Sequence, residues 1–162
     1  MIRVREGARD DVEFVIDSIR GLAEYEKLTH EVEASAELLD RHLFGEPRYA
    51  ELLIGEIDDS PAGYALFFHS YSTFLTRPGI FLEDLYVLPD LRGSGLGRAL
   101  LGRIASLAVE RQCGRVEWSV LDWNEPALAF YRSLGARPVD GWTTYRLVGE
   151  ALDRFAASSD GR

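Results

Sequence analysis

The sequence predicts an α/β sandwich built around a mixed β-sheet. In several short runs apolar residues alternate with polar ones, as in strands, and in other segments they recur every three or four residues, as in amphipathic helices. The two kinds of segment are interleaved along 162 residues, of which 46% are hydrophobic. This is enough apolar material for one core but not for two ordinary domains. We therefore expect a single domain over residues 1–157 and a short polar tail at 158–162.

The N-terminal third combines one strand with two helices. Residues 2–5 alternate in character and predict the strand, and an amphipathic helix should begin at Asp10 or Asp11. A second, shorter helix is expected between Ser35, a favourable N-cap residue, and Gly45, which typically ends a helix.

Three strand-like runs form the middle of the chain, at residues 50–57, 63–69 and 80–88. The turn sequence DDSP at residues 58–61 joins the first two runs and indicates a hairpin. These runs are expected to supply the centre of the sheet.

The C-terminal third alternates helices and strands. Apolar residues at helical spacing run from Leu96 to Ala108, followed by a strand at 116–120 and a helix at 125–134. The segment Trp142–Val148 is expected to close the sheet as its last strand, and a short helix is expected near Leu152.

Charge and composition argue against several classes of function. Eighteen basic and 27 acidic residues give a net charge of -9, which repels nucleic acid and anionic membranes and favours cationic partners. The single cysteine, Cys113, cannot form an internal disulfide, and the three histidines lack metal-ligand spacing. Because neither a leader segment nor an apolar run of membrane length is apparent, we expect a cytoplasmic protein that uses no metal.

The most informative segment reads RGSGLGRALL, begins at Arg92 and lies between a strand and a helix. Its glycines, Gly93, Gly95 and Gly97, allow consecutive N–H groups to point into one concavity, and the following helix adds its positive N-terminal end. Arg92 and Arg98 flank these glycines. We interpret the segment as a phosphate-binding turn; the alternative is a glycine-rich connection with no ligand.

The spacing of this turn differs from the two commonest phosphate loops. A P-loop ends in Gly-Lys-Ser/Thr, whereas Gly97 is followed by Arg98. A dinucleotide-binding loop reads GxGxxG in the first βα unit, whereas this one reads GxGxG and lies past the middle of the chain. Glu117, the acid about twenty residues later, falls within a strand pattern. A dinucleotide-dependent oxidoreductase is therefore only a distant alternative.

Three segments together resemble a known family. They are LAEYE at residues 22–26, LEDLYVLPDLRGSGLG at 82–97 and WNEPALAFYRSLGA at 123–136. They resemble the GNAT superfamily of acyl-CoA-dependent N-acetyltransferases and, within it, the diamine branch with the spermidine/spermine and thialysine N-acetyltransferases. The similarity extends over about residues 2–147. It implies a three-layer sandwich with a central mixed, mostly antiparallel sheet flanked by helices, acetyl-CoA as cosubstrate, and a homodimer.

The resemblance assigns the cosubstrate to the turn and to the strand before it. The turn would hold the pyrophosphate, and free backbone groups at a bulge or splay of the strand would bind the pantetheine arm and polarise the thioester. Asn124 would contact the same arm, although asparagine is also an ordinary helix cap. The residues expected to bind acetyl-CoA are Leu85, Tyr86, Val87, Arg92, Gly93, Ser94, Gly95, Leu96, Gly97, Arg98 and Asn124.

The transfer also needs a base, because an alkylammonium with a pKa of about 10.4 is almost fully protonated at neutral pH. Glu83 and Asp84 are adjacent acids in an otherwise apolar strand, so their side chains should face opposite sides of the sheet. By resemblance, Glu83 deprotonates the amine through water and Asp84 helps to bind the cationic chain. The alternative is that the acids end the strand in solvent or accept backbone hydrogen bonds.

Tyr131 is the expected acid. A phenol has a reference pKa of about 10 and a thiol one of about 8.5, so proton delivery to the departing thiolate is downhill. Without the resemblance, Tyr131 would be interpreted as a core aromatic beside Phe130. Cys113 lies at the far end of the helix that follows the turn, so no acetyl-cysteine is expected.

The acceptor pocket is expected to contain Tyr25, Glu26 and Trp118 beside the two acids of the strand. On their own, Tyr25 and Glu26 would be a solvated helix end, and Trp118 fits core packing equally well. Polyamine-acetylating members of the family carry an aspartate and a tryptophan where this chain has Ser72 and Phe74. A short diamine, thialysine or another small primary amine therefore fits at least as well as a long polyamine.

The expected function is thus direct acetyl transfer from acetyl-CoA to a primary amine of a small cationic acceptor. The alternative from another class is a catalytically idle acyl-CoA-binding sensor, against which Tyr131 and Glu83 argue. The strand expected at Trp142–Val148 would leave an edge available for pairing in the homodimer.

Overall fold

The structure, a computed structural model, describes residues 1–159. The chain divides into two compact units, Met1–Leu121 and a C-terminal unit that begins at Asp122. Within the described residues, no helix is both long enough and apolar enough to cross a bilayer.

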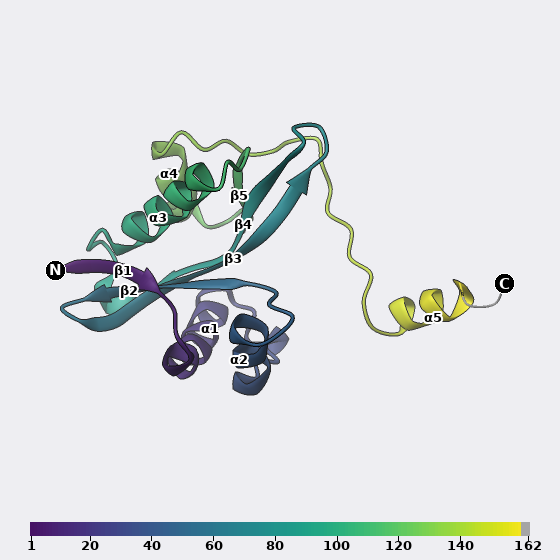
Figure 1. Ribbon diagram of the computed structural model, residues 1–162, viewed down its shortest axis with the longest axis horizontal. Coiled ribbons are helices and arrows are strands. Elements are labelled where there is room, and N and C mark those ends of the chain that lie inside the picture. Colours follow the sequence, from purple (N-terminus) through teal and green to yellow (C-terminus); the bar gives the residue numbers. More distant parts are fainter. Residues whose placement is uncertain (160–162) are drawn as a thin grey trace. The chain divides into compact units, whose positions relative to one another are not determined.

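The first unit is a five-stranded mixed sheet with helices, as the sequence predicts (Figure 1). The strands lie in the order β1-β2-β3-β4-β5; all neighbouring pairs are antiparallel except β4 and β5, which are parallel and joined by α3. The strands are β1 (Ile2–Glu6), β2 (Glu51–Ile57), β3 (Ser60–Ser72), β4 (Arg77–Val87) and β5 (Val116–Trp118), and the helices are α1 (Val12–Glu26), α2 (Ala36–Phe44) and α3 (Leu96–Glu110).

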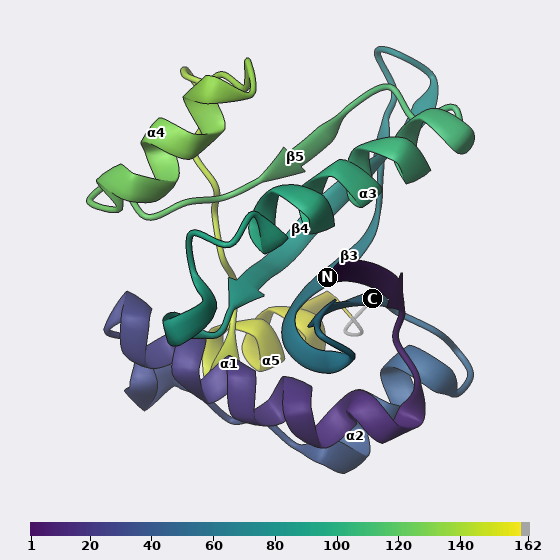
Figure 2. The ribbon, with the colours of Figure 1, turned by 90° about the vertical axis from the view of Figure 1, so that its left-hand side faces the viewer.

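The helices cover both faces of this sheet and complete three layers (Figures 1 and 2). On one face, Val15 of α1 and Leu43 of α2 belong to the same buried cluster as Ile54 of β2. On the opposite face, α3 approaches so closely that a Cβ on Gly55 would lie 2.7 Å from a methyl carbon of Leu96. Glycine at position 55 therefore lets α3 pack directly on the sheet backbone.

Local signals in the sequence explain where several elements begin and end. The Ser35 hydroxyl accepts a hydrogen bond from the Leu38 N–H (3.3 Å) and caps α2, which ends at Gly45 as expected. The β2–β3 hairpin turns at Asp58 and Asp59, with φ angles of 50° and 62°. Aspartate tolerates this left-handed conformation better than most residues, which suits a two-residue hairpin loop.

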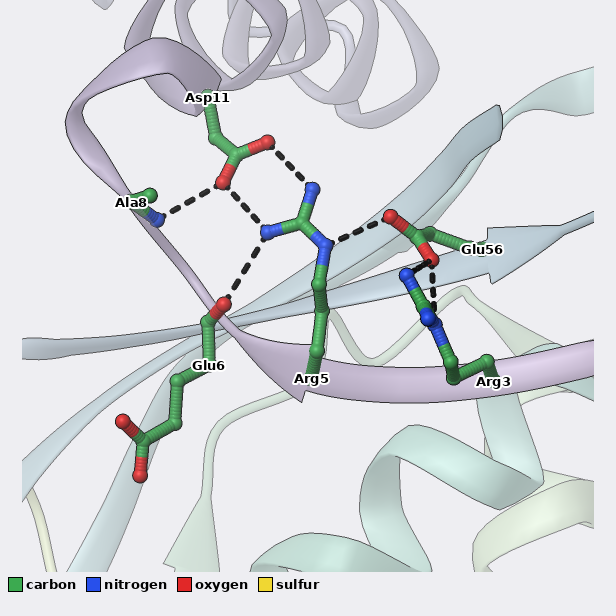
Figure 3. A network of polar contacts seen from close by, with 6 residues as sticks. All are labelled: Arg3, Arg5, Glu6, Ala8, Asp11 and Glu56. Atoms are coloured by element: carbon green, nitrogen blue, oxygen red, sulfur yellow. Dashed lines mark hydrogen bonds and ion pairs between the residues drawn. The ribbon is translucent and has the colours of Figure 1, made fainter. Parts of the chain in front are cut away.

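A network of charged side chains links β1 to β2 and to Asp11, the residue before α1 (Figure 3). Arg5 donates to both carboxylate oxygens of Asp11, at 2.7 and 2.8 Å, and its Nε donates to Glu56 of β2 at 2.6 Å. The Arg3 guanidinium donates to the other Glu56 oxygen at 2.8 Å. The hydrogen bonds from Arg5 hold the pKa of Asp11 below its ordinary value, against the opposing effect of burial.

The C-terminal unit contains α4 (Glu125–Ser133) and α5 (Gly149–Ser159). The strand predicted at Trp142–Val148 is wrong, because this segment has no strand pairing and irregular backbone. Its alternating aromatic and β-branched residues satisfy local strand propensity, but a strand exists only where a neighbour completes its hydrogen-bond ladder. The helix expected near Leu152 is confirmed and includes Ser158 and Ser159 of the expected tail; residues 160–162 lie outside the described part.

Candidate active site

The glycine turn before α3 is open on its outer side. Gly93 and Gly95 have φ angles of 81° and 95°, which other L-residues rarely adopt. A Cβ on Gly93 would meet no atom within 4 Å, and one on Gly95 would meet only the Ile2 side chain, at 3.8 Å. Backbone groups of the turn are therefore accessible to a ligand.

Two amides at the start of α3 precede the helical hydrogen-bond pattern. The Leu96 N–H donates to the Ser94 hydroxyl (3.3 Å), and the first helical bond runs from the Ala99 N–H to the Gly95 carbonyl (3.0 Å). The N–H groups of Gly97 and Arg98 lie between these two bonds, at the positive end of the helix dipole. Together with the exposed Arg98 side chain, they suit an anion such as pyrophosphate.

Arg92 connects the turn to α1. Its Nε donates to the Val87 carbonyl at 3.0 Å, and its guanidinium carbon lies 4.9 Å from the Tyr25 ring centre and 5.5 Å from that of Tyr86. The guanidinium is thus engaged with aromatic faces on β4 and at the end of α1. Arg92 therefore links the glycine turn to β4 and to the end of α1.

β4 carries a bulge at Glu83. Phe67 of β3 pairs with the residue before Glu83, and Leu66 pairs with the residue after it, Asp84, so Glu83 is the extra residue of the bulge. Phe67 lies beneath Arg111, which directly follows α3, whereas Leu66 packs against the cluster on the α1 face. The bulge therefore shifts the alternation by one and places Asp84 on the α1 face, while Glu83 is exposed.

One edge of β4 opens after the bulge. β5 pairs with β4 only along Val116–Trp118, and Trp118, which is partly buried, pairs with Leu82. The Leu88 N–H donates to β3, and because successive residues of an antiparallel pair point their backbone groups to opposite sides, those of Leu85 and Val87 face the open edge. The backbone N–H and C=O of Tyr86, which lies between them, instead point toward β3.

The carboxyl groups of Glu26, at the end of α1, and of Asp84, on β4, lie near each other on the α1 face of the sheet. Tyr64 donates its hydroxyl to Asp84 Oδ2 at 2.8 Å. Burial raises the pKa of Asp84, although the Tyr64 hydrogen bond opposes this, and burial together with the nearby Asp84 charge raises the pKa of Glu26. Among the described residues, neither carboxyl group forms an ion pair with a basic side chain.

The remaining predicted site residues belong to the C-terminal unit. Asn124 is the N-cap residue of α4 but makes no side-chain capping hydrogen bond. Tyr131 lies in the last turn of this helix, with its ring centre 5.6 Å from that of Phe130. Seven residues correspond to about two helical turns, so Asn124 and Tyr131 are on the same side of α4.

Comparison with known proteins identifies the family. The model of the Acetyltransferase (GNAT) family matches residues 16–136. The chain belongs to the GNAT family of acetyltransferases. The acetyltransferase is 37% identical over 165 residues to the thialysine N-epsilon-acetyltransferase of Mus musculus, covering 95% of this chain and 96% of that protein. It is 28% identical to the spermidine/spermine N(1)-acetyltransferase-like protein 1 of Homo sapiens, covering 93% of this chain and 23% of that protein.

A solved structure supports the fold. The integron cassette protein VCH_CASS6 from V. cholerae superposes with a TM-score of 0.77 at 24% identity, covering 96% of this chain and 97% of that one. The family model and the thialysine N-epsilon-acetyltransferase relatives show that the enzyme transfers an acetyl group to an amine, and acetyltransferases of this family use acetyl-CoA. The two alternatives, a catalytically idle acyl-CoA-binding sensor and a dinucleotide-dependent oxidoreductase, are not favoured.

Proposed function

We propose that the acetyltransferase transfers the acetyl group of acetyl-CoA directly to the primary amine of a small cationic acceptor, such as thialysine or a diamine. The observation that carries this proposal is the pair of carboxyl groups, Glu26 and Asp84, on the α1 face without an ion-pair partner in the described residues. A partly buried acid pair of this kind is stabilised by a bound cation. The relatives named thialysine N-epsilon-acetyltransferases support the same class of acceptor.

The turn and the open edge of β4 would hold acetyl-CoA, which supplies the acetyl group as a thioester. The amides of Gly97 and Arg98 would bind the pyrophosphate, within the turn formed by residues 92–98. The backbone groups of Leu85 and the N–H of Val87 would bind the pantetheine arm and polarise the thioester carbonyl, while the Val87 carbonyl already accepts a hydrogen bond from Arg92. Asn124 would contact the same arm.

Glu83 and Tyr131 would move the protons. The bulge exposes Glu83, which accepts a proton from the acceptor ammonium through water, and the Tyr131 hydroxyl returns a proton to the leaving sulfur. The transfer would proceed without an acetyl-cysteine intermediate. Cys113 lies beyond α3, which is about 22 Å long at about 1.5 Å per residue.

The acceptor would lie against Tyr25, Glu26 and Asp84, with Trp118 near the open edge. The structure of the β3–β4 hairpin supports a short acceptor. Ser72, which accepts a hydrogen bond from the Leu75 N–H at 3.2 Å, and the exposed Phe74 both have uncharged side chains, so neither adds a negative charge for a long polyamine.

We also propose that the acetyltransferase is a cytoplasmic homodimer that uses no metal and binds neither nucleic acid nor membrane. The net charge of -9 supports the exclusion of polyanionic partners. Among residues 1–159, no group of three or more His, Cys, Asp and Glu side chains is placed to hold a metal ion.

The test of acceptor class is release of free thiol from acetyl-CoA with thialysine, lysine, a diamine and a neutral-tailed monoamine of equal length. We expect kcat/KM to be at least tenfold higher for the cationic acceptors than for the monoamine, about 1.4 kcal/mol, and the advantage to shrink with added salt. Equal rates for acceptors with and without a second cationic group would remove the acceptor class. Binding of acetyl-CoA without turnover of any amine would favour the sensor.

The proposed proton transfers are tested by Tyr131→Phe and Glu83→Gln. Tyr131→Phe should lower kcat about a hundredfold with nearly unchanged acetyl-CoA affinity, and Glu83→Gln should slow the reaction most at low pH, where the amine is most protonated. Tyr49→Phe and Glu13→Gln are matched exposed controls and should keep parental rates. If the Tyr131 and Glu83 variants behave like these controls, the assigned roles are wrong.

A further inference from the structure

Tyr64 lies behind the acceptor carboxylates, in the middle of β3. Its side chain is 0% exposed and belongs to the core cluster that contains Val15 and Leu43. The ring centre lies 6.2 Å from that of Tyr86 on the adjacent strand. Because packing fixes the ring on several sides, the hydroxyl has little freedom to change position.

The hydroxyl of this tyrosine is the hydrogen-bond donor to Asp84. It binds Oδ2 at 2.8 Å, and within the described residues this is the one side-chain hydrogen bond of Asp84. The bulge at Glu83 brings Asp84 to the face on which Tyr64 lies. A hydroxyl has one proton to donate, so it binds one carboxylate oxygen and leaves lone pairs of the other available.

A tyrosine is suited to this position because it donates a hydrogen bond without adding positive charge. An arginine or lysine here would neutralise Asp84, as Arg5 neutralises Asp11 elsewhere in the same unit. A cationic acceptor would then compete with a built-in cation. Tyr64 supports the carboxylate through a hydrogen bond and leaves the place of a paired cation to a ligand.

We propose that Tyr64 is a positioning residue for the acceptor: its buried hydroxyl fixes one oxygen of Asp84 so that the carboxylate binds the second, non-reacting ammonium group of the acceptor. This inference rests on the proposed function, because it needs a cationic acceptor at Asp84. It adds a residue that sequence patterns assign only to the strand core. Tyr64 touches neither reacting atom in this proposal and acts through Asp84.

The pH dependence of acceptor binding follows from the groups that surround Asp84. Tyr64 on β3 and Tyr86 on β4 are the aromatic neighbours and bring no positive charge, and Glu26 on α1 is the like charge. The Tyr64 hydrogen bond lowers the pKa of Asp84 while burial raises it, so loss of the hydroxyl should raise that pKa further. The acidic limb of kcat/KM for a cationic acceptor should therefore move to higher pH.

The experiment is Tyr64→Phe, assayed with a diamine and with a monoamine of equal length over a range of pH. We expect KM for the diamine to rise at least tenfold near neutral pH, kcat to stay within about twofold, and the monoamine parameters to remain close to parental. The control Tyr49→Phe removes an exposed hydroxyl and should change none of these values. Equal losses for both acceptors, or no change for either, would overturn the proposal.

A double-mutant cycle tests the proposal even if Tyr64→Phe lowers the stability of the protein. Asp84→Asn is combined with Tyr64→Phe, and the melting temperature of each variant is recorded beside its KM for the diamine. We expect Tyr64→Phe to have little further effect on KM once Asp84 is neutral, whereas additive effects would contradict action through Asp84. If the parental enzyme acetylates no amine, the proposed function fails and this inference with it; if it acetylates diamines and the cycle is additive, only the inference fails.

Discussion

Asp11 and Asp84 lie in opposite electrostatic surroundings within the same unit. Asp11 accepts two hydrogen bonds from Arg5, whereas Asp84 receives one from a neutral tyrosine. The pKa of Asp11 is accordingly lowered and that of Asp84 raised. A carboxylate with a resident cation stabilises the fold, whereas one without such a cation favours binding of a charged ligand.

The Arg5–Asp11 pair predicts how stability responds to acid. The folded-state pKa of Asp11 is below its unfolded value of about 3.8, so its contribution is fully present above that value and is lost as the pH falls through the folded-state pKa. Asp11→Asn should therefore lower the free energy of unfolding at pH 7 by about 2 kcal/mol and flatten its decline in acid. Urea denaturation at neutral and acidic pH measures both effects.

Asp10→Asn is the matched control for this variant, because Asp10 is the exposed neighbour in sequence. Its substitution should leave the pH dependence close to parental. A decline in acid that is as steep in Asp11→Asn as in the parent would assign the acid sensitivity to other carboxylates.

At the scale of elements, the start of α3 predicts a charge effect on acetyl-CoA binding. Arg98 lies in the first turn of α3 beside the open amides, whereas Arg103 lies farther along and pairs with Glu110 at 2.8 Å. Arg98→Gln should weaken acetyl-CoA binding by about three- to tenfold, and more at low salt than at high salt. Calorimetric titration of acetyl-CoA into each variant provides the measurement.

Arg103→Gln is the control, since it removes the same charge from the same helix away from the turn. It should bind acetyl-CoA like the parent. Matching losses in both variants would indicate a general effect of net charge instead of contact at the turn.

Elements with short-range signals could be predicted from the sequence, and those set by long-range pairing could not. Ser35 and Gly45 determine the ends of α2 through hydrogen bonds within one turn, so a local pattern suffices. The bulge at Glu83 arises from the register against β3, and Trp142–Val148 lacks a strand partner. Neither fact is encoded in local propensity, because pairing depends on residues distant in sequence.

The candidate site divides in the same way. The glycine turn could be predicted because its glycines and flanking arginines are recognisable from residue type alone. In the structure, Gly93 and Gly95 have the positive φ angles that such a turn requires. The stacking of Arg92 on Tyr25 and the hydrogen bond from Tyr64 to Asp84 join separate elements, so the sequence alone gave no indication of either. Tyr64 in particular resembles any aromatic residue of a buried strand.

At the scale of the whole molecule, the proposed homodimer is testable by mass. The edge strand expected at Trp142–Val148 is absent, and β1 and β5 are the edges of the described sheet. The dimer therefore rests on the resemblance to the diamine branch. Light scattering should give about twice the chain mass of 18.2 kDa at micromolar concentration, and a monomer there would remove the proposal.

The short pairing between β4 and β5 has a consequence for the order in which the molecule assembles. β2, β3 and β4 are consecutive along the chain and form a meander whose contacts close small loops, whereas β5 joins only after the chain has crossed over through α3. Because closing short loops costs less entropy, the meander is expected to form early and β5 to dock late. The Tyr64–Asp84 contact would then exist in a partly folded chain before the glycine turn has been brought to the sheet.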